Sequence, residues 1–264
     1  MKTTRSEFMH ELYALLAVIL VIHGFYTAVV RPRAVAILAA QQAAMAKDPE
    51  YVPQRTIWVI AKDYEQEVCV ILSLWAGIVM AFRARTATRG RRLLAKDLLH
   101  LPEGMRVLPE DSREYLRQIE GLEGATREQL LPRALASALE RFGATRSVQD
   151  ASAAARNLCQ MENERLDSEL AMVRFVAWAI PALGFVGTVR GIGESLQQAH
   201  RAIEGDVSGV TAGLGVSFNA TLIALTLSIV VMFFLHQLQL VQERLVLDTE
   251  VYVDERLLRH LHVR

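Results

Sequence analysis

Four long runs of apolar residues predict four membrane-spanning helices. The runs lie at residues 12–30, 68–82, 175–192 and 207–235. A helix rises about 1.5 Å per residue, so about 20 apolar residues cross a hydrocarbon layer about 30 Å thick. The run at residues 68–82 is short for a span. Either an earlier helix start or the extended side chains of the arginines that follow it would compensate.

The stretches between these runs are polar and lack the two-residue alternation of strands, which predicts an all-α membrane protein. Residues 31–67 contain an alanine-rich helical piece and a break between Pro49 and Pro53. Residues 83–170 form the only soluble region of domain size, which we expect to be helical. Residues 238–264 are expected to continue as a helix.

Helix-breaking residues suggest where the helices of the soluble region end. Gly143 is expected to terminate one helix, and no breaker follows from Ser147 until Pro181. We therefore predict one helix of about 51 Å that runs from the soluble region into the membrane. In the C-terminal helix, an apolar stripe is expected to pack against this long helix or its copy in a neighbouring subunit. Its members are Leu240, Leu247, Val251, Leu258 and Leu261.

Charge predicts the topology. Residues 83–96 hold the densest cluster of arginine and lysine, which favours the cytoplasmic side, although Arg31 and Arg33 argue weakly for the opposite orientation. With four spans, both termini are then cytoplasmic and residues 31–67 are extracytoplasmic. The formal net charge of zero offers no basis for nucleic-acid binding.

The sequence offers little for enzymatic chemistry. It has no glycine-rich phosphate loop, no metal-ligand cluster and no nucleophile beside a base. The two cysteines do not suggest a disulfide framework, and His260 and His262 are too few for a metal site. We therefore expect no enzymatic activity, no metal and no cofactor.

The last two membrane helices carry small and hydroxylated residues on narrow faces. The first face comprises Pro181, Gly184, Thr188 and Gly191, with Gly187 beside it, and the second comprises Gly213, Ser217, Thr221, Ala224 and Ser228. Asn219 and Thr226 share the opposite face of the last helix. Small residues allow helices to approach closely in lipid, and hydroxyl groups there must face protein or water.

The segments IPALGFVGTVRGI and GLGVSFNATLIALTLSIV resemble the MotA/TolQ/ExbB proton-channel family over about residues 170–255. The resemblance implies a ring of identical subunits, usually five, in the bacterial inner membrane. Two copies of a partner similar to MotB, TolR or ExbD would lie inside the ring, and each would carry an essential Asp on its single membrane helix. Flow of protons, or of sodium ions, would turn one component against the other.

Carried over residue by residue, the resemblance implies that Thr188 and Thr221 are pore threonines and that Pro181 is the helix-breaking proline. Residues 171–237 would then form the pore helices. The sequence departs from the family pattern at Val216, where the ExbB pattern has Glu, and at Asn219, where some relatives have an acid. Arg190 replaces a residue that is often aromatic.

Titratable side chains are missing from residues 175–189 and 207–235. Hydroxyl groups do not titrate near neutral pH. If the chain conducts protons, the carboxylate that carries them must come from another polypeptide, while Thr188, Ser217 and Thr221 form hydrogen bonds to it or to pore water.

Several alternatives stay open at this stage. Arg190 either pairs with Glu194 on one helical face or shapes the electric field at the outer mouth of the pore. His23 is either a proton-relay group or a neutral side chain that is hydrogen-bonded within the bundle. The chain as a whole is either the ion-driven motor subunit or a non-conducting membrane scaffold.

Overall fold

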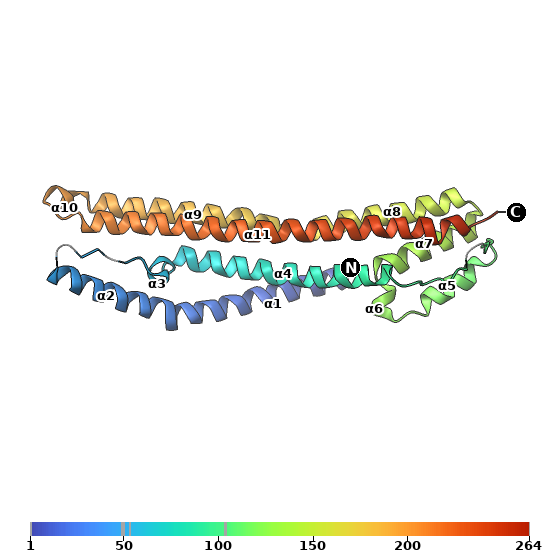
Figure 1. Ribbon diagram of the computed structural model, residues 1–264, viewed down its shortest axis with the longest axis horizontal. Coiled ribbons are helices and arrows are strands. Elements are labelled where there is room, and N and C mark those ends of the chain that lie inside the picture. Colours follow the sequence, from blue (N-terminus) through green and yellow to red (C-terminus); the bar gives the residue numbers. More distant parts are fainter. Residues whose placement is uncertain (1, 49–50, 53, 103–104, 264) are drawn as a thin grey trace. The chain divides into compact units, whose positions relative to one another are not determined.

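The computed structural model describes residues 2–48, 51–52, 54–102 and 105–263, and for residues 2–8 it describes only the backbone. Within these ranges the chain is helical and contains no strand (Figure 1). One isolated bridge joins Val107 and Leu261. The all-α prediction is therefore confirmed. The expected break between Pro49 and Pro53 lies largely outside the described residues.

Four helical segments of the described chain are long and apolar enough to cross a membrane, as the sequence predicted. They are Met9–Lys47, Tyr64–Leu94, Val148–Gln197 and Ser208–His260. The second begins at Tyr64, four residues before the apolar run, so an earlier helix start supplies the length that the run lacks.

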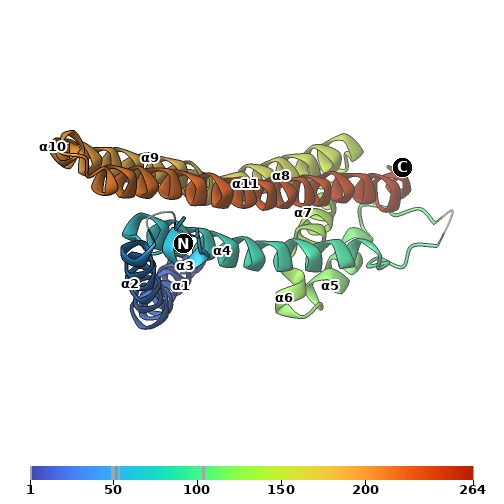
Figure 2. The ribbon, with the colours of Figure 1, turned by 60° about the vertical axis from the view of Figure 1, so that its left-hand side comes forward.

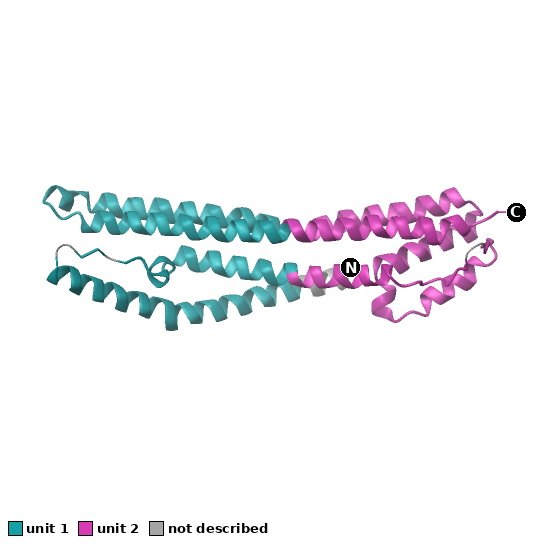
Figure 3. Ribbon diagram, in the orientation of Figure 1, with its two compact units in different colours: residues 1–80, 172–235 teal, residues 81–171, 236–264 magenta. Residues whose placement is uncertain are grey.

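The chain divides into two compact units (Figure 3). Unit 1 comprises residues 1–80 and 172–235, and unit 2 comprises residues 81–171 and 236–264.

Unit 1 contains the apolar runs at residues 12–30, 175–192 and 207–235 and most of the run at residues 68–82. Its elements are α1 (Lys2–Phe25), η1 (Tyr26–Val30), α2 (Arg31–Lys47), α3 (Ile57–Ile60), α10 (Ala199–Ile203), and parts of α4 (Tyr64–Leu94), α9 (Ala171–Gln197) and α11 (Ser208–Arg256). Within unit 1, α9 and the first half of α11 lie side by side in both views (Figures 1 and 2). The indole nitrogen of Trp75 donates to the Glu11 carbonyl at 2.9 Å, which ties α4 to α1.

The helix predicted from Ser147 to Pro181 begins where predicted, with Ser147 as its N-cap, but it is interrupted at Leu170 and continues past Pro181. The helix α8 (Val148–Glu169) ends before Leu170, whose N–H group bonds to the Asp167 and Ser168 carbonyls in a tightened last turn. Pro181, by contrast, lies inside α9 and does not end it. No glycine or proline marks the interruption at Leu170, so the sequence pattern could not reveal it.

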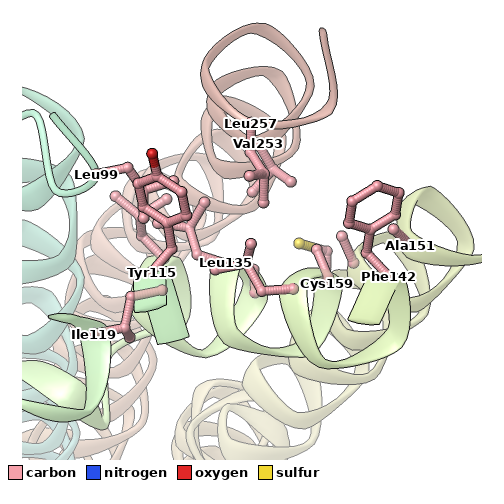
Figure 4. Close-up of a cluster of buried hydrophobic side chains, with 14 of the residues drawn as sticks. Leu99, Tyr115, Ile119, Leu135, Phe142, Ala151, Cys159, Val253 and Leu257 are labelled. Carbon is pink, nitrogen blue, oxygen red and sulfur yellow. The ribbon is translucent and has the colours of Figure 1, made fainter. Parts of the chain in front are cut away.

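Unit 2 encloses a hydrophobic core between short helices and the second half of α11 (Figure 4). The helices that line the core are α5 (Ser112–Glu120), α7 (Leu130–Thr145) and α8, while α6 (Gly124–Arg127) and the 3-10 turn η2 (Leu258–His260) complete the unit. The side chains of Leu135, Phe142 and Leu257 are completely buried in this core.

Two details of unit 2 differ from the prediction. Gly143 does not end its helix: α7 continues to Thr145 and stops at Arg146 in the left-handed conformation (φ 56°). A Cβ atom on Gly143 would lie 2.7 Å from the Ser112 hydroxyl, so this glycine permits close packing instead. The predicted C-terminal stripe is buried only in part: Leu261 lies in the core and Leu258 packs against it, whereas Leu247 and Val251 are 59% and 55% exposed in the single chain. The buried face of this region is formed by Leu245, Val246, Thr249, Val253 and Leu257.

Candidate functional site

The hydroxyl groups of Thr188 on α9 and Thr221 on α11 are in hydrogen-bond contact. The Thr188 hydroxyl also lies 3.0 Å from the Gly184 carbonyl, and Ser217 Oγ donates to the Thr188 carbonyl at 3.1 Å. Both threonines are half-buried, whereas Ser217 is buried. The three residues that the sequence singled out for an ion pathway thus form one polar cluster between the two helices.

The same antiparallel register holds along the whole contact between α9 and α11. Ser195 Oγ donates to the Val210 carbonyl at 3.0 Å, Ser217 to Thr188 at 3.1 Å, and Ser228 to the Ala177 carbonyl at 3.1 Å. Between successive contacts both helices advance by the same number of residues, first seven and then eleven. No residue is inserted or skipped, so the two helices keep one register through the Thr188–Thr221 cluster.

Glycines make this close approach feasible. A Cβ atom on Gly184 would lie 2.6 Å from Ala224 Cβ, and one on Gly187 would overlap Ala220 Cβ. Gly191 and Gly213 face each other, because a Cβ atom on either would lie within 2.7 Å of the other's carbonyl oxygen. The expectation that these small residues allow close packing therefore has a direct geometric basis.

Arg190 lies two residues beyond Thr188 and forms a charged cluster with acidic residues. Its Nε and Nη2 atoms contact the two carboxylate oxygens of Glu65 on α4 at 2.6 and 2.9 Å, and Nη1 contacts Glu194 at 2.9 Å. Asp63 lies 4.0 Å away. The Glu65 side chain is 13% exposed and that of Glu194 is 46% exposed. The two-atom contact of Arg190 with Glu65 is therefore better shielded from water than its contact with Glu194.

The pairing of Arg190 with Glu194 that the sequence suggested is present, and the stronger contact with Glu65 was missed. Glu65 is 125 residues away in the chain, and no local spacing rule links the two positions. The signal available was charge alone: an arginine near the end of one apolar run and carboxylates just before another.

Asn219 is 7% exposed and accepts a hydrogen bond from Arg55 at 2.9 Å. Thr226, on the same predicted face, is exposed, and its hydroxyl donates to the Leu222 carbonyl of its own helix at 2.8 Å. Asn219 therefore points away from the Thr188–Thr221 cluster and serves to attach the segment before α3 to α11.

A second charged cluster surrounds Glu67 on α4. Its carboxylate, with a side chain only 5% exposed, pairs with His23 Nδ1 at 2.7 Å and with Arg31. In an α-helix, residues eight positions apart point about 80° apart. The π-helical turn η1 between His23 and Arg31 turns less per residue and so brings them closer to one face. His23 thus has a hydrogen-bond partner within the bundle.

The turn that leads into α11 is held by Asp206. This carboxylate accepts a hydrogen bond from the Ser208 hydroxyl and another from the Ser208 N–H group at 3.0 Å. These hydrogen bonds, above all that from the hydroxyl, hold the pKa of Asp206 below its usual range. The start of α11 therefore keeps a negative charge near its N-terminal amides.

Among the described residues, no group of three or more His, Cys, Asp or Glu side chains is arranged to hold a metal ion. Cys69 and Cys159 are free and buried. Within the described chain, the candidate site is thus a cluster of hydroxyl groups with acidic and basic residues beside it. It has no set of side chains that could bind a metal.

Four apolar helices and a hydrogen-bonded hydroxyl interface between the last two define a multi-pass helical membrane protein. The sequence model of the MotA/TolQ/ExbB proton channel family matches residues 126–251 of the chain. The match includes Thr188 and Thr221 and confirms the resemblance. Neither the curated proteins nor the solved structures gave a match.

Proposed function

We propose that the chain is the ring-forming subunit of an ion-driven rotary motor in the bacterial inner membrane. The ring, a pentamer, surrounds two copies of a single-span partner whose membrane helix supplies the ion-carrying Asp. Protons, or sodium ions, move between the partner and the ring, and their flow is converted into mechanical work. The proposal assigns no enzymatic step and no cofactor to the chain.

The observation that carries this proposal is the contact between the Thr188 and Thr221 hydroxyl groups within two apolar, titratable-free stretches. A hydroxyl group both donates and accepts hydrogen bonds but does not exchange its own proton near neutral pH. Such a pair can solvate a carboxylate in either protonation state while the carboxylate carries the proton. The match of residues 126–251 to the proton-channel family model supports the same division of labour.

The energy available is sufficient for a mechanical step. One proton that crosses a potential of about 150 mV releases about 3.5 kcal/mol, at about 2.3 kcal/mol per 100 mV. Since about 1.4 kcal/mol corresponds to a factor of ten, this energy biases a conformational step several-hundredfold. Each protonation of the partner's carboxylate is enough to favour one step of the ring.

Exposed apolar side chains on α9 and α11 support assembly in a bilayer. Trp178, Phe185, Phe218 and Ile229 are 61–73% exposed in the single chain. Apolar side chains at membrane depth contact either lipid or neighbouring subunits. The basic cluster at residues 83–96 supports an orientation with both termini in the cytoplasm.

The competing function is a non-conducting scaffold. It is favoured by Val216 and Asn219, which stand where relatives can have acidic residues, and by the use of Asn219 as a partner of Arg55. In that case the hydroxyl contacts between α9 and α11 would serve packing alone.

Native mass spectrometry of the detergent-solubilised complex tests the proposal. The chain is co-expressed with the product of a neighbouring reading frame that encodes one apolar helix with an Asp. Five copies of the chain with two of that product are expected. A stable ring that never recruits a carboxylate-bearing helix would overturn the motor and favour the scaffold.

A further inference from the structure

Pro181 leaves one backbone carbonyl of α9 without its helical donor. Proline has no N–H group, so the Ala177 carbonyl, four residues earlier, cannot form the usual helix bond. Ala177 is 1% exposed and lies in an apolar span, where water does not replace a missing donor.

Ser228 on α11 supplies the missing donor. Its hydroxyl donates to the Ala177 carbonyl at 3.1 Å, and Ser228 itself is 8% exposed. The contact joins residues 51 positions apart and belongs to the same register as the Ser217–Thr188 contact. The gap that Pro181 creates in α9 is thus closed by a side chain of the neighbouring helix.

Ser228 and Thr221 lie seven residues apart, two turns along one face of α11. A proline removes one helix bond and makes α9 free to bend at this point. If α9 bent there without restraint, the part that carries Thr188 would move relative to α11. The Ser228 hydroxyl opposes that movement because it fixes α9 to α11 on the far side of the proline.

We propose that Ser228 is a positioning residue that closes the gap at Pro181 and thereby holds Thr188 against Thr221. Its importance for ion flow rests on the function proposed above. The positioning itself is a property of this chain, which can be measured without any ion flux.

A double-mutant cycle tests the link to Pro181. Ser228→Ala alone is expected to shift the unfolding equilibrium of the full chain in lipid–detergent micelles about three- to fifteenfold toward unfolding, the range of interhelical hydrogen bonds in membranes. In the Pro181→Ala background, residue 181 again has an N–H group for the Ala177 carbonyl. There Ser228→Ala is expected to have little effect, whereas an equal effect in both backgrounds would overturn the proposal.

Ser228→Thr and Thr226→Val are the matched variants. Ser228→Thr keeps a hydroxyl and is expected to retain most of the stability that Ser228→Ala loses. Thr226→Val removes a hydroxyl from the exposed side of the same helix, where it donates to the Leu222 carbonyl of its own helix at 2.8 Å, and is expected to be neutral. If Thr226→Val lost as much stability as Ser228→Ala, the effect would not be specific to the Pro181 gap, and the proposal would be overturned.

Disulfide trapping measures the positioning directly. The pair Thr188→Cys and Thr221→Cys is expected to cross-link rapidly under mild oxidation, because the two hydroxyl groups are in contact. Adding Ser228→Ala is expected to lower the rate severalfold, as followed by mass spectrometry of the linked peptides. An unchanged rate would overturn the positioning role. Absence of ion flux in every variant, with these two results as expected, would instead overturn only the proposed function.

Discussion

The Thr188 hydroxyl on α9 contacts the Thr221 hydroxyl on α11. Ser217, one turn before Thr221 on α11, donates its hydroxyl to the Thr188 carbonyl. The two threonines are 33 residues apart in the chain and come from helices that the sequence treats as separate runs. Their contact places the two polar faces of the predicted pore helices against each other, half-buried and without a charged side chain between them.

Thr221→Val is expected to abolish ion-driven work while the complex still assembles. Valine keeps the shape of threonine but cannot bond to Thr188 or to a carboxylate. Proton uptake into vesicles that contain the complex is expected to fall at least about tenfold, as for loss of one hydrogen bond to a charged group. Thr226→Val, on the exposed face, is the control and is expected to keep the flux. Normal flux in Thr221→Val would sink the assignment of this threonine.

Gly184→Ala is expected to destabilise the contact between α9 and α11. The added methyl group would lie 2.6 Å from Ala224 Cβ, and the alanine has no flexible end that can move aside. Overpacking of this kind costs about 1–3 kcal/mol of unfolding free energy. Gly77→Ala in α4 is the control, because its added Cβ atom would have no neighbour within 4 Å among the described residues outside the local helix backbone. Equal unfolding free energies for the two variants would contradict the close approach.

Glu65→Gln is expected to destabilise the chain more than Glu194→Gln does. Both carboxylates contact Arg190, but Glu65 binds two guanidinium nitrogens and is 13% exposed, whereas Glu194 is 46% exposed. We expect about 1 kcal/mol or more for Glu65 and about 0.5 kcal/mol or less for Glu194. The unfolding free energy in micelles measures both. A larger loss of unfolding free energy for Glu194→Gln would show that the contact of Arg190 with Glu65 is not the stronger one.

Leu135→Ala in unit 2 is expected to cost about 2–5 kcal/mol, because the side chain is completely buried and its removal leaves a cavity. Leu247→Ala is the matched control in α11, where the leucine is 59% exposed. It is expected to change the unfolding free energy by about 0.5 kcal/mol or less. A large loss of unfolding free energy for Leu247→Ala in the single chain would show that Leu247 packs in the core, as the sequence suggested.

The sequence was sufficient for the helices and for the small-residue faces, because both depend on local spacing. Apolar runs reveal spans, and recurrence at three and four residues reveals which side chains share a face. Gly184, Thr188, Ser217 and Thr221 were all identified in this way. The limits of the membrane segments and the ion-pathway roles of these residues stay predictions.

Other features depend on contacts between distant segments and could not be read from local pattern. Glu65 beside Arg190 and Arg55 beside Asn219 join residues more than 100 positions apart. In the C-terminal stripe, Leu261 is buried as expected, but α11 turns Val253 and Leu257 inward instead of Leu247 and Val251. Pro181 stays inside its helix, and the Ala177 carbonyl that it leaves without a helical donor accepts a hydrogen bond from Ser228, 51 residues away.

The most direct test of the account is proton flux into vesicles that contain this chain alone or together with the Asp-bearing single-span partner. With no titratable side chain in residues 175–189 or 207–235, the chain alone is expected to conduct no protons. Flux is expected to appear with the partner and to vanish when the partner's Asp is changed to Asn. Equal flux with and without the partner would contradict the claim that the ion-carrying carboxylate comes from another polypeptide.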